Sequence, residues 1–360
     1  RAADGEERHD QRRDVAQGPC LLGCPRRRRR QSPYHRRPDS TCYPARSVHA
    51  QGYRNRDYVI ADESIRLLLV VNRRFRIDRH FQALAGERHP ETSPRALRKA
   101  AHYLTTEFAK SGWATGSQPV RAWGRVYRNV VAIKYPNRSR QGTELPPLLI
   151  GAHYDTVSGS PGADDNASGL VVLLEVASRL RAQTLERPVW LVAFTLEEQD
   201  RLGSQAFASR LKAEGRELVG AIILECVGFA KSEAGTQQAP PGIPITVPTQ
   251  GDFLAIVGNE ASRSLVNRLE QEAQLHVASL KTLSLVVPGQ GEAMPHTRRS
   301  DHASFWDTGY PAVVLTDTAN FRNPHYHRET DTVDTLNLDF LSKVVATVTA
   351  TTIQIAGVRP

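Results

Sequence analysis

Four apolar runs in this chain each lead directly to residues that can bind a metal ion. The first run, residues 147–152, is followed by His153 and Asp155. The other three lead to carboxylates: Glu197 with Glu198, Glu225, and Asp317. Such short apolar runs are typical of buried strands, and helical patterns lie between them. This alternation predicts an α/β three-layer sandwich, with a mostly parallel central sheet and helices on both faces.

The pattern also predicts where the individual elements lie. A helix should begin at Pro94, with Ser93 as its capping residue, and end before Gly112. We expect further strands at 126–135, 148–152, 189–195, 219–224 and 312–315, and further helices at 169–182, 204–214, 260–275 and 338–355.

The polar residues after these strands predict a metal site, because ligands of open α/β sheets gather at the carboxyl ends of the strands. Asp164 and Asp165 lie in a tight turn before the helix at 169, and His327 lies in the loop after the last strand. Imidazole and carboxylate ligands without thiolates suit zinc. Their number indicates two ions about 3.5–4 Å apart that share one carboxylate. Of the pair Glu197 and Glu198, one side chain can bind metal while the other moves protons.

Taken together and in order, these motifs resemble the zinc peptidase family M28. The resemblance rests on His153-x-Asp155, Ala-Asp-Asp-Asn-Ala-Ser-Gly (163–169), Glu197-Glu198, Leu-Glu225 and Tyr326-His327. It extends from about residue 80 to 355 and includes the segments 84–90 and 300–302. It implies a phosphorylase/hydrolase-like fold and a dizinc aminopeptidase, which removes the first residue of a peptide with a free N-terminus by attack of an activated water.

The resemblance also assigns a role to each matching residue. One zinc would be held by His153 and Glu225, the other by Glu198 and His327, with Asp165 bridging the two. Glu197 would be the general base, and Tyr326 would donate to the carbonyl oxygen as it becomes an oxyanion. Asp155 would hydrogen-bond the imidazole of His153 and fix its orientation. Many family members have Asp where this chain has Glu225, and Glu remains a suitable oxygen ligand.

Two other functions fit parts of the pattern. A glutaminyl cyclase closes a pyroglutamyl ring with a single zinc, and needs only one aspartate, one glutamate and one histidine. A binding module of the same fold would have lost the base or a ligand. The full set of five ligands, which includes His153, favours the dizinc exopeptidase.

Single motifs have simpler interpretations when they are taken alone. Asp164-Asp165 is a common turn and helix cap, and the resemblance favours Asp165 over Asp164 as the ligand. Asp301 and His302 could line the substrate pocket or form a structural pair, and the sequence leaves this open.

Charge and composition divide the chain into two parts. Residues 1–60 carry 14 arginines and 7 acidic residues, so +7 of the net charge of +9 lies there. We expect this segment to be a disordered extension rather than a nucleic-acid or membrane tether. The nearly neutral remainder, 61–360, should form one domain that does not bind nucleic acid. Within this domain, residues 230–300 should be an insert that shapes the substrate pocket.

The cysteines and the hydropathy of the chain say little more about its class or its compartment. Cys226, the one cysteine outside the first 60 residues, should be a small buried hydrophobe. No run approaches the ~20 apolar residues of a membrane span, and no signal peptide is recognisable at the start. The compartment and the oligomeric state stay open.

Overall fold

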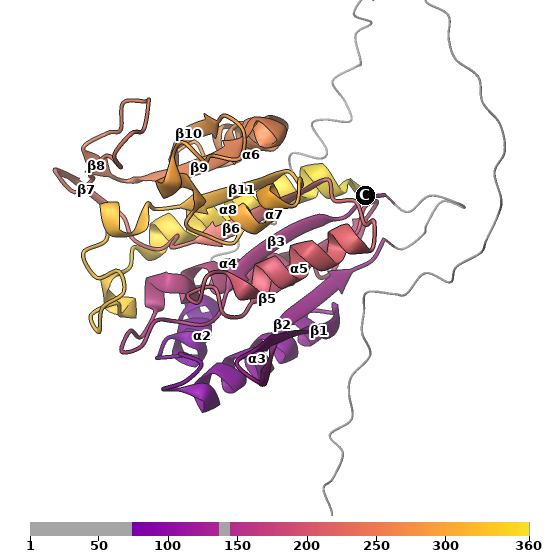
Figure 1. Ribbon diagram of the computed structural model, residues 1–360. Coiled ribbons are helices and arrows are strands. Elements are labelled where there is room, and N and C mark those ends of the chain that lie inside the picture. The colour runs from indigo at the N-terminus through magenta and orange to yellow at the C-terminus, as the bar shows by residue number, and fades with distance from the viewer. Residues whose placement is uncertain (1–73, 137–144, 360) are drawn as a thin grey trace, which may run out of the picture.

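An eight-stranded sheet forms the centre of the molecule in the computed structural model, which describes residues 74–136 and 145–359 (Figure 1). The strands lie in the order β1 (Ala114–Ala122), β2 (Arg125–Lys134), β5 (Val189–Phe194), β3 (Leu148–His153), β6 (Gly220–Glu225), β11 (Ala312–Thr316), β9 (Phe253–Asn259) and β10 (Lys281–Val287). The central strands β5, β3, β6 and β11 are parallel, as the sequence predicts. Antiparallel pairs of β1 with β2, β2 with β5, and β9 with β11 make the whole sheet mixed.

Helices cover both faces of this sheet and complete the predicted three layers. Side chains of five helices share one hydrophobic cluster with the sheet: α2 (Arg74–Leu84), α3 (Pro94–Lys110), α4 (Gly169–Arg179), α6 (Arg263–His276) and α8 (Leu338–Ala356). The other face is covered by α5 (Leu202–Ala213) and α7 (His302–Asp307). Two small ribbons lie outside the sheet: β4 (Thr184–Leu185) with β12 (Val358–Arg359), and β7 (Lys231–Ala234) with β8 (Gln250–Gly251).

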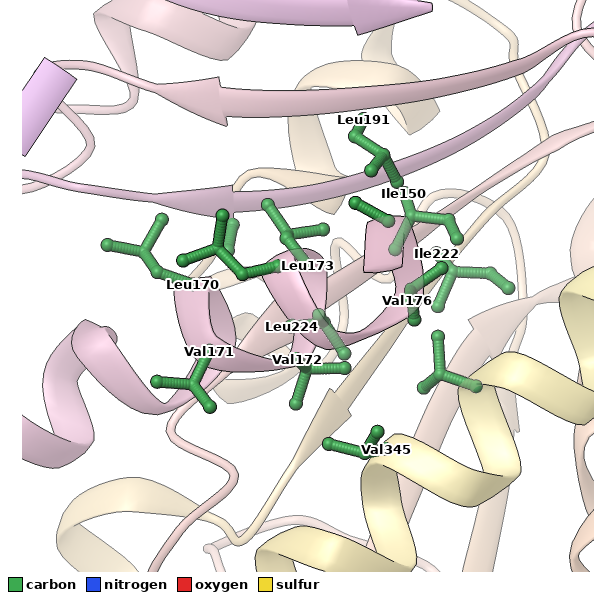
Figure 2. Close-up of a cluster of buried hydrophobic side chains, with 14 of the residues drawn as sticks. Ile150, Leu170, Val171, Val172, Leu173, Val176, Leu191, Ile222, Leu224 and Val345 are labelled. Carbon is green, nitrogen blue, oxygen red and sulfur yellow. The ribbon is translucent and has the colours of Figure 1, made fainter. Parts of the chain in front are cut away.

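Alternation along the strands explains why both faces are covered. In β3, Leu148 and Ile150 join one cluster while Leu149 joins the other. Helix α4 is apolar around most of its circumference because it lies between the sheet and α8, and Figure 2 shows its side chains between Leu191 of β5 and Val345 of α8. Each fully buried side chain of this kind contributes about 1.5–3 kcal/mol.

The elements expected from the sequence are present, and the differences are local. Helix α3 begins at Pro94 as predicted, but the Ser93 side chain makes no capping hydrogen bond. Pro94 removes one unpaired N–H donor from the helix start, but not the donor that a capping serine would serve. Part of segment 230–300 is regular: β9 and β10 extend the sheet at one edge, and α6 packs against them. The prediction for residues 1–60 falls outside the described residues. In the described part, no helix is long and apolar enough to cross a membrane.

An ion pair joins α2, the first described helix, to α4, and its contribution to stability can be tested. Arg76 donates to both carboxylate oxygens of Glu175, which is fully buried. We expect Arg76→Ala to lower the free energy of unfolding by roughly 3 kcal/mol, because it leaves a buried carboxylate without its main partner. Arg79→Ala on the same helix is the control. Arg79 is half exposed where it meets Glu107, so its loss should cost less than about 1 kcal/mol. Equal urea midpoints for the two variants would contradict this account.

Candidate metal centre

The carboxyl ends of three neighbouring parallel strands bring the predicted ligands together. His153 is the last residue of β3 and Glu225 the last of β6. Glu197 and Glu198 follow β5, after a turn in which Leu196 has a positive φ of 57°. Two loops complete the cluster. Asp165 comes from the turn Ala163–Ser168 before α4, where its own backbone is not helical, and His327 comes from the loop after β11.

The carboxylate of Asp165 lies between the two histidines and faces each with a different oxygen. Its Oδ1 is 3.0 Å from His153 Nε2, and its Oδ2 is 3.0 Å from His327 Nε2. Glu225 Oε2 lies 3.4 Å from His153 Nε2, and Glu198 Oε2 lies 3.2 Å from His327 Nε2. The five predicted ligands therefore form two groups, each with one histidine and one glutamate, and Asp165 belongs to both.

Several buried polar atoms of this cluster make no hydrogen bond of good geometry among the described residues: His153 Nε2, both carboxylate oxygens of Asp165, and Glu198 Oε1. Within the described ranges, three of them have only the ion-pair contacts given above. Buried polar atoms in folded proteins are nearly always hydrogen-bonded, so this set fits a site whose partners are metal ions. His153, Asp165 and Glu198 can place ligand atoms within 4.8 Å of one another, and so can Asp165, Glu225 and Cys226. Imidazole and carboxylate donors are typical of zinc.

The carboxylates of the cluster favour positive charge at both histidines. Burial opposes charge on His153, but Glu225 and Asp165 raise its pKa well above the ordinary value. Burial opposes charge on His327, yet the carboxylates of Asp165 and Glu198 raise its pKa to about 10. Burial likewise opposes ionisation of Asp165, but the two imidazoles hold its pKa well below the ordinary value. Burial and the nearby Asp165 raise the pKa of Glu198 to about 7. Burial also raises the pKa of Glu197 well above its ordinary value.

Asp155 supports the cluster in a different way from the predicted one. The hydrogen-bond partner of His153 Nδ1 is the backbone carbonyl of Asp155, at 3.2 Å, while the carboxylate lies 3.8 Å away. That carboxylate accepts the backbone N–H groups of Glu197 and Glu198, each at 3.1 Å. Asp155 thereby fixes the turn after β5 as well as the imidazole at the end of β3.

Asp164 and Asp317 lie close to the cluster, and their carboxylates accept hydrogen bonds, mostly from backbone N–H groups. Asp164 accepts the N–H of Gly228 at 2.8 Å and the side-chain amide of Asn323 at 2.7 Å. Asp317 accepts the N–H groups of Phe229 and Ala319. Both carboxylates are buried, and their oxygens have partners in the protein.

Two residues without a predicted role hold the turn that carries Asp165. Asp331 accepts the backbone N–H groups of Asp164 and Asp165, at 2.9 and 3.1 Å. Arg88 is buried and donates to the carbonyl oxygens of five residues: Tyr154, Leu84, Gly86, Pro161 and Gly162. Arg88 belongs to segment 84–90, which was part of the resemblance. Asp331 lies in no motif that could have indicated it.

Ser300 and Tyr326 also contact the cluster. Ser300 Oγ donates to Glu225 Oε2 at 2.8 Å. The ring of Tyr326 stacks on the imidazole of His327, with centroids 3.8 Å apart. Burial and the neighbouring carboxylates, Asp165 first among them, raise the pKa of the Tyr326 hydroxyl far above its ordinary value. The phenol therefore keeps its proton and can donate a hydrogen bond to an oxygen.

Asp301 and His302, whose roles the sequence leaves open, are both buried at the start of α7. His302 Nε2 contacts the carbonyl of Thr297 at 2.7 Å, and its ring packs edge-on against Trp306. Burial lowers the pKa of His302 to about 4, so it is neutral at pH 7. His302 has structural contacts and also lines a cavity beside the cluster.

That cavity, here called the side pocket, opens next to Glu225 and Tyr326 and has a volume of about 110 Å³. Seven apolar side chains line it: Ile243, Ala255, Val257, Leu285, Val314, Ala319 and Phe321. Hydroxyl side chains and two histidines, His296 and His302, complete much of the rest of the wall. Four of the seven apolar residues come from segment 230–300, the segment expected to shape the substrate pocket.

Comparison with known proteins decides the family. The sequence model of peptidase family M28 matches residues 129–352. The chain belongs to peptidase family M28. The Escherichia coli (strain K12) protein YfbL is 36% identical over 273 residues, which is 71% of this chain and 80% of that protein. A probable leucine aminopeptidase of Arthroderma otae is 30% identical over 54% of this chain. The M28 chain spans about half the length of that relative, 49%.

Solved structures confirm the M28 fold. The LapA aminopeptidase of Legionella pneumophila superposes with a TM-score of 0.62 at 19% identity, over 86% of this chain and 78% of LapA. The glutaminyl cyclase of Porphyromonas gingivalis superposes with a TM-score of 0.56 at 22% identity, over 80% of this chain and 95% of the cyclase. At this level of identity the likeness establishes the α/β sandwich alone, and the chemistry must be argued from the side chains.

Proposed function

We propose that this protein is a dizinc aminopeptidase that hydrolyses the first peptide bond of a substrate with a free N-terminus. The observation that carries the proposal is the position of Asp165 between two imidazoles, with one carboxylate oxygen directed to each. A carboxylate placed in this way can bridge two ions, as two-metal hydrolases require. His153 and Glu225 would hold one ion, and Glu198 and His327 the other.

Three residues around this centre would carry out or support the other steps of the reaction. Bound zinc would polarise the scissile carbonyl and lower the pKa of water, which is the Lewis-acid chemistry of such sites. Glu197 is not needed as a ligand, and its buried carboxylate accepts the proton of the attacking water and passes it to the leaving amine. The Tyr326 hydroxyl donates to the carbonyl oxygen as negative charge develops on it. Asp155 holds the backbone of Glu197 and Glu198 in place.

Hydrolysis of aminoacyl anilides tests the proposed reaction. We expect the zinc-loaded protein to hydrolyse anilides with a free α-amine, releasing the aniline, and to lose this activity in a chelator. N-acetylated versions of the same substrates are the matched control and should not be cleaved. Cleavage of the acetylated substrates would contradict an aminopeptidase. Ring closure of N-terminal glutamine by a protein with a single zinc would replace the proposal with a cyclase.

The assignment of His327 as a ligand can be tested without activity. We expect His327→Ala to bind one zinc equivalent fewer than the unaltered protein, because one of the two groups loses its only imidazole. His325→Ala is the control: the Nδ1 of His325 contacts Thr330 Oγ1 at 2.9 Å, and His325 is not part of the cluster. Full zinc content in His327→Ala, with loss in His325→Ala, would mean that the ligand had been misassigned.

A further inference from the structure

The side pocket lies where the side chain of a substrate's first residue would be held, if the proposed function is correct. It is lined by Glu225 and Tyr326, one a proposed zinc ligand and the other the proposed donor to the scissile carbonyl. A first residue bound there has its carbonyl at the metal centre and its side chain toward the apolar walls. A volume of about 110 Å³ has room for several water-sized groups, enough for an aliphatic side chain.

The mouth of the side pocket carries an arginine with two side-chain partners. Arg299 lines the pocket and is exposed. Its Nη1 donates to Asn320 Oδ1 at 2.6 Å, and its Nη2 donates to the Tyr326 hydroxyl at 3.4 Å. The guanidinium carbon lies 5.8 Å from the centre of the Tyr326 ring. These contacts hold the group at the mouth without neutralising it, because both hydrogen-bond partners are uncharged.

No other charge on the pocket wall offsets that of Arg299. Among the described residues that line the pocket, Glu225 is the only carboxylate, and its charge would be taken up by the metal. Within the described ranges Arg299 makes no ion pair, whereas its neighbour Arg298 is paired with Asp307 at 2.6 Å. His302 is neutral at pH 7 because burial lowers its pKa. A substrate side chain that enters the pocket therefore meets a positive mouth above apolar walls.

We propose that Arg299 sets the charge preference of the side pocket, so that the enzyme disfavours substrates beginning with Lys or Arg and accepts apolar or acidic first residues. The apolar walls bind the aliphatic part of the side chain. The guanidinium repels the ammonium or guanidinium of a first residue whose side chain occupies the pocket, and attracts a carboxylate there. Arg299 acts on the substrate side chain, which does not take part in the reaction, so it determines specificity rather than chemistry.

The test uses three anilides that differ in terminal charge: lysyl, norleucyl and glutamyl. Norleucine has the same straight chain as lysine without the ammonium, which isolates charge from size. In the zinc-loaded protein, kcat/KM should be higher for norleucyl than for lysyl anilide. Arg299→Glu should raise the lysyl to norleucyl ratio and lower the glutamyl to norleucyl ratio, each by roughly tenfold. Arg299→Lys should keep the original order, and added salt should weaken the preference.

Arg298→Gln is the control variant. It removes a charge one residue away whose side chain is paired with Asp307 outside the pocket, so the substrate ratios should not change. Equal slowing of all three substrates in Arg299→Glu would overturn the proposal, and would mean that Arg299 acts through Tyr326 instead. Unchanged ratios would overturn it as well.

A binding measurement separates this inference from the proposed function. Titration calorimetry of free lysine, norleucine and glutamate into the zinc-loaded protein reports the charge preference without turnover. If none of the anilides is cleaved, the proposed function fails, while the order of the three affinities still tests Arg299. The expected order places lysine last in the unaltered protein and glutamate last in Arg299→Glu. Any order that Arg299→Glu leaves unchanged contradicts the inference.

Discussion

Replacing Glu197 with Gln should leave both zinc ions bound and reduce kcat for an aminoacyl anilide roughly a hundredfold or more. Glutamine has nearly the same size and keeps one side-chain oxygen, but it cannot accept the proton of water or return it to the leaving amine. The backbone at this position should not move, because the Glu197 N–H is held by the Asp155 carboxylate, which the substitution does not touch. Steady-state kinetics and zinc analysis of the same preparation measure the two quantities together.

Glu198→Gln is the matched control for this change. Glu198 is the adjacent residue, and its Oε2 lies 3.2 Å from His327 Nε2. Its substitution should therefore remove zinc, whereas that of Glu197 should not. Near-normal turnover of Glu197→Gln would show that the proton is carried by another group. Loss of zinc from Glu197→Gln would instead make Glu197 a ligand.

Replacing Asp165 with Asn should have the largest effect on metal binding. An amide has one acceptor oxygen and no negative charge, so it cannot join two ions as a carboxylate can. We expect zinc affinity to fall by more than the roughly 10–100-fold typical of losing an outer partner of a ligand. Activity at limiting zinc should fall with it. Competition against a chromophoric zinc chelator measures the affinity of each site.

The neighbouring carboxylate provides the comparison for Asp165. Asp164→Asn removes an acceptor that serves Gly228 and Asn323, so it should lower the melting temperature while two zinc ions can still be loaded. The two aspartates are adjacent in sequence and equal in size, and they differ in what their oxygens face. If Asp164→Asn lost zinc and Asp165→Asn kept it, the bridging role would belong to Asp164.

The residues at the carboxyl ends of the strands are the part of the site that the sequence predicts best. His153 and Glu225 each end an apolar run, and parallel neighbours in a sheet must bring such residues to one edge. The choice of Asp165 over Asp164 rested on resemblance, since adjacent residues in a turn point in directions that local patterns do not encode. In the structure the two carboxylates differ in their partners: Asp165 faces the imidazole of His153, and Asp164 accepts the N–H of Gly228.

Contacts between segments that are distant in the chain could not be predicted from the sequence. Asp331 binds the N–H of Asp165 from 166 residues away, and no local pattern marks a loop carboxylate for that role. The role of Arg88 is similar, because its acceptors are backbone carbonyls that any sequence would provide. Strand β1 was missed for another reason: it lies at the sheet edge, and its sequence Ala-Thr-Gly-Ser-Gln-Pro-Val-Arg-Ala lacks a regular apolar alternation.

The number of zinc ions per chain tests the central claim most directly. The full chain would be loaded with zinc, dialysed to remove loosely bound metal, and analysed by inductively coupled plasma mass spectrometry against protein concentration. A carboxylate shared by two histidine-containing groups predicts two zinc ions per chain, falling to one in His327→Ala. One zinc ion per unaltered chain, or none, would contradict a bridging Asp165 and with it the two-metal mechanism.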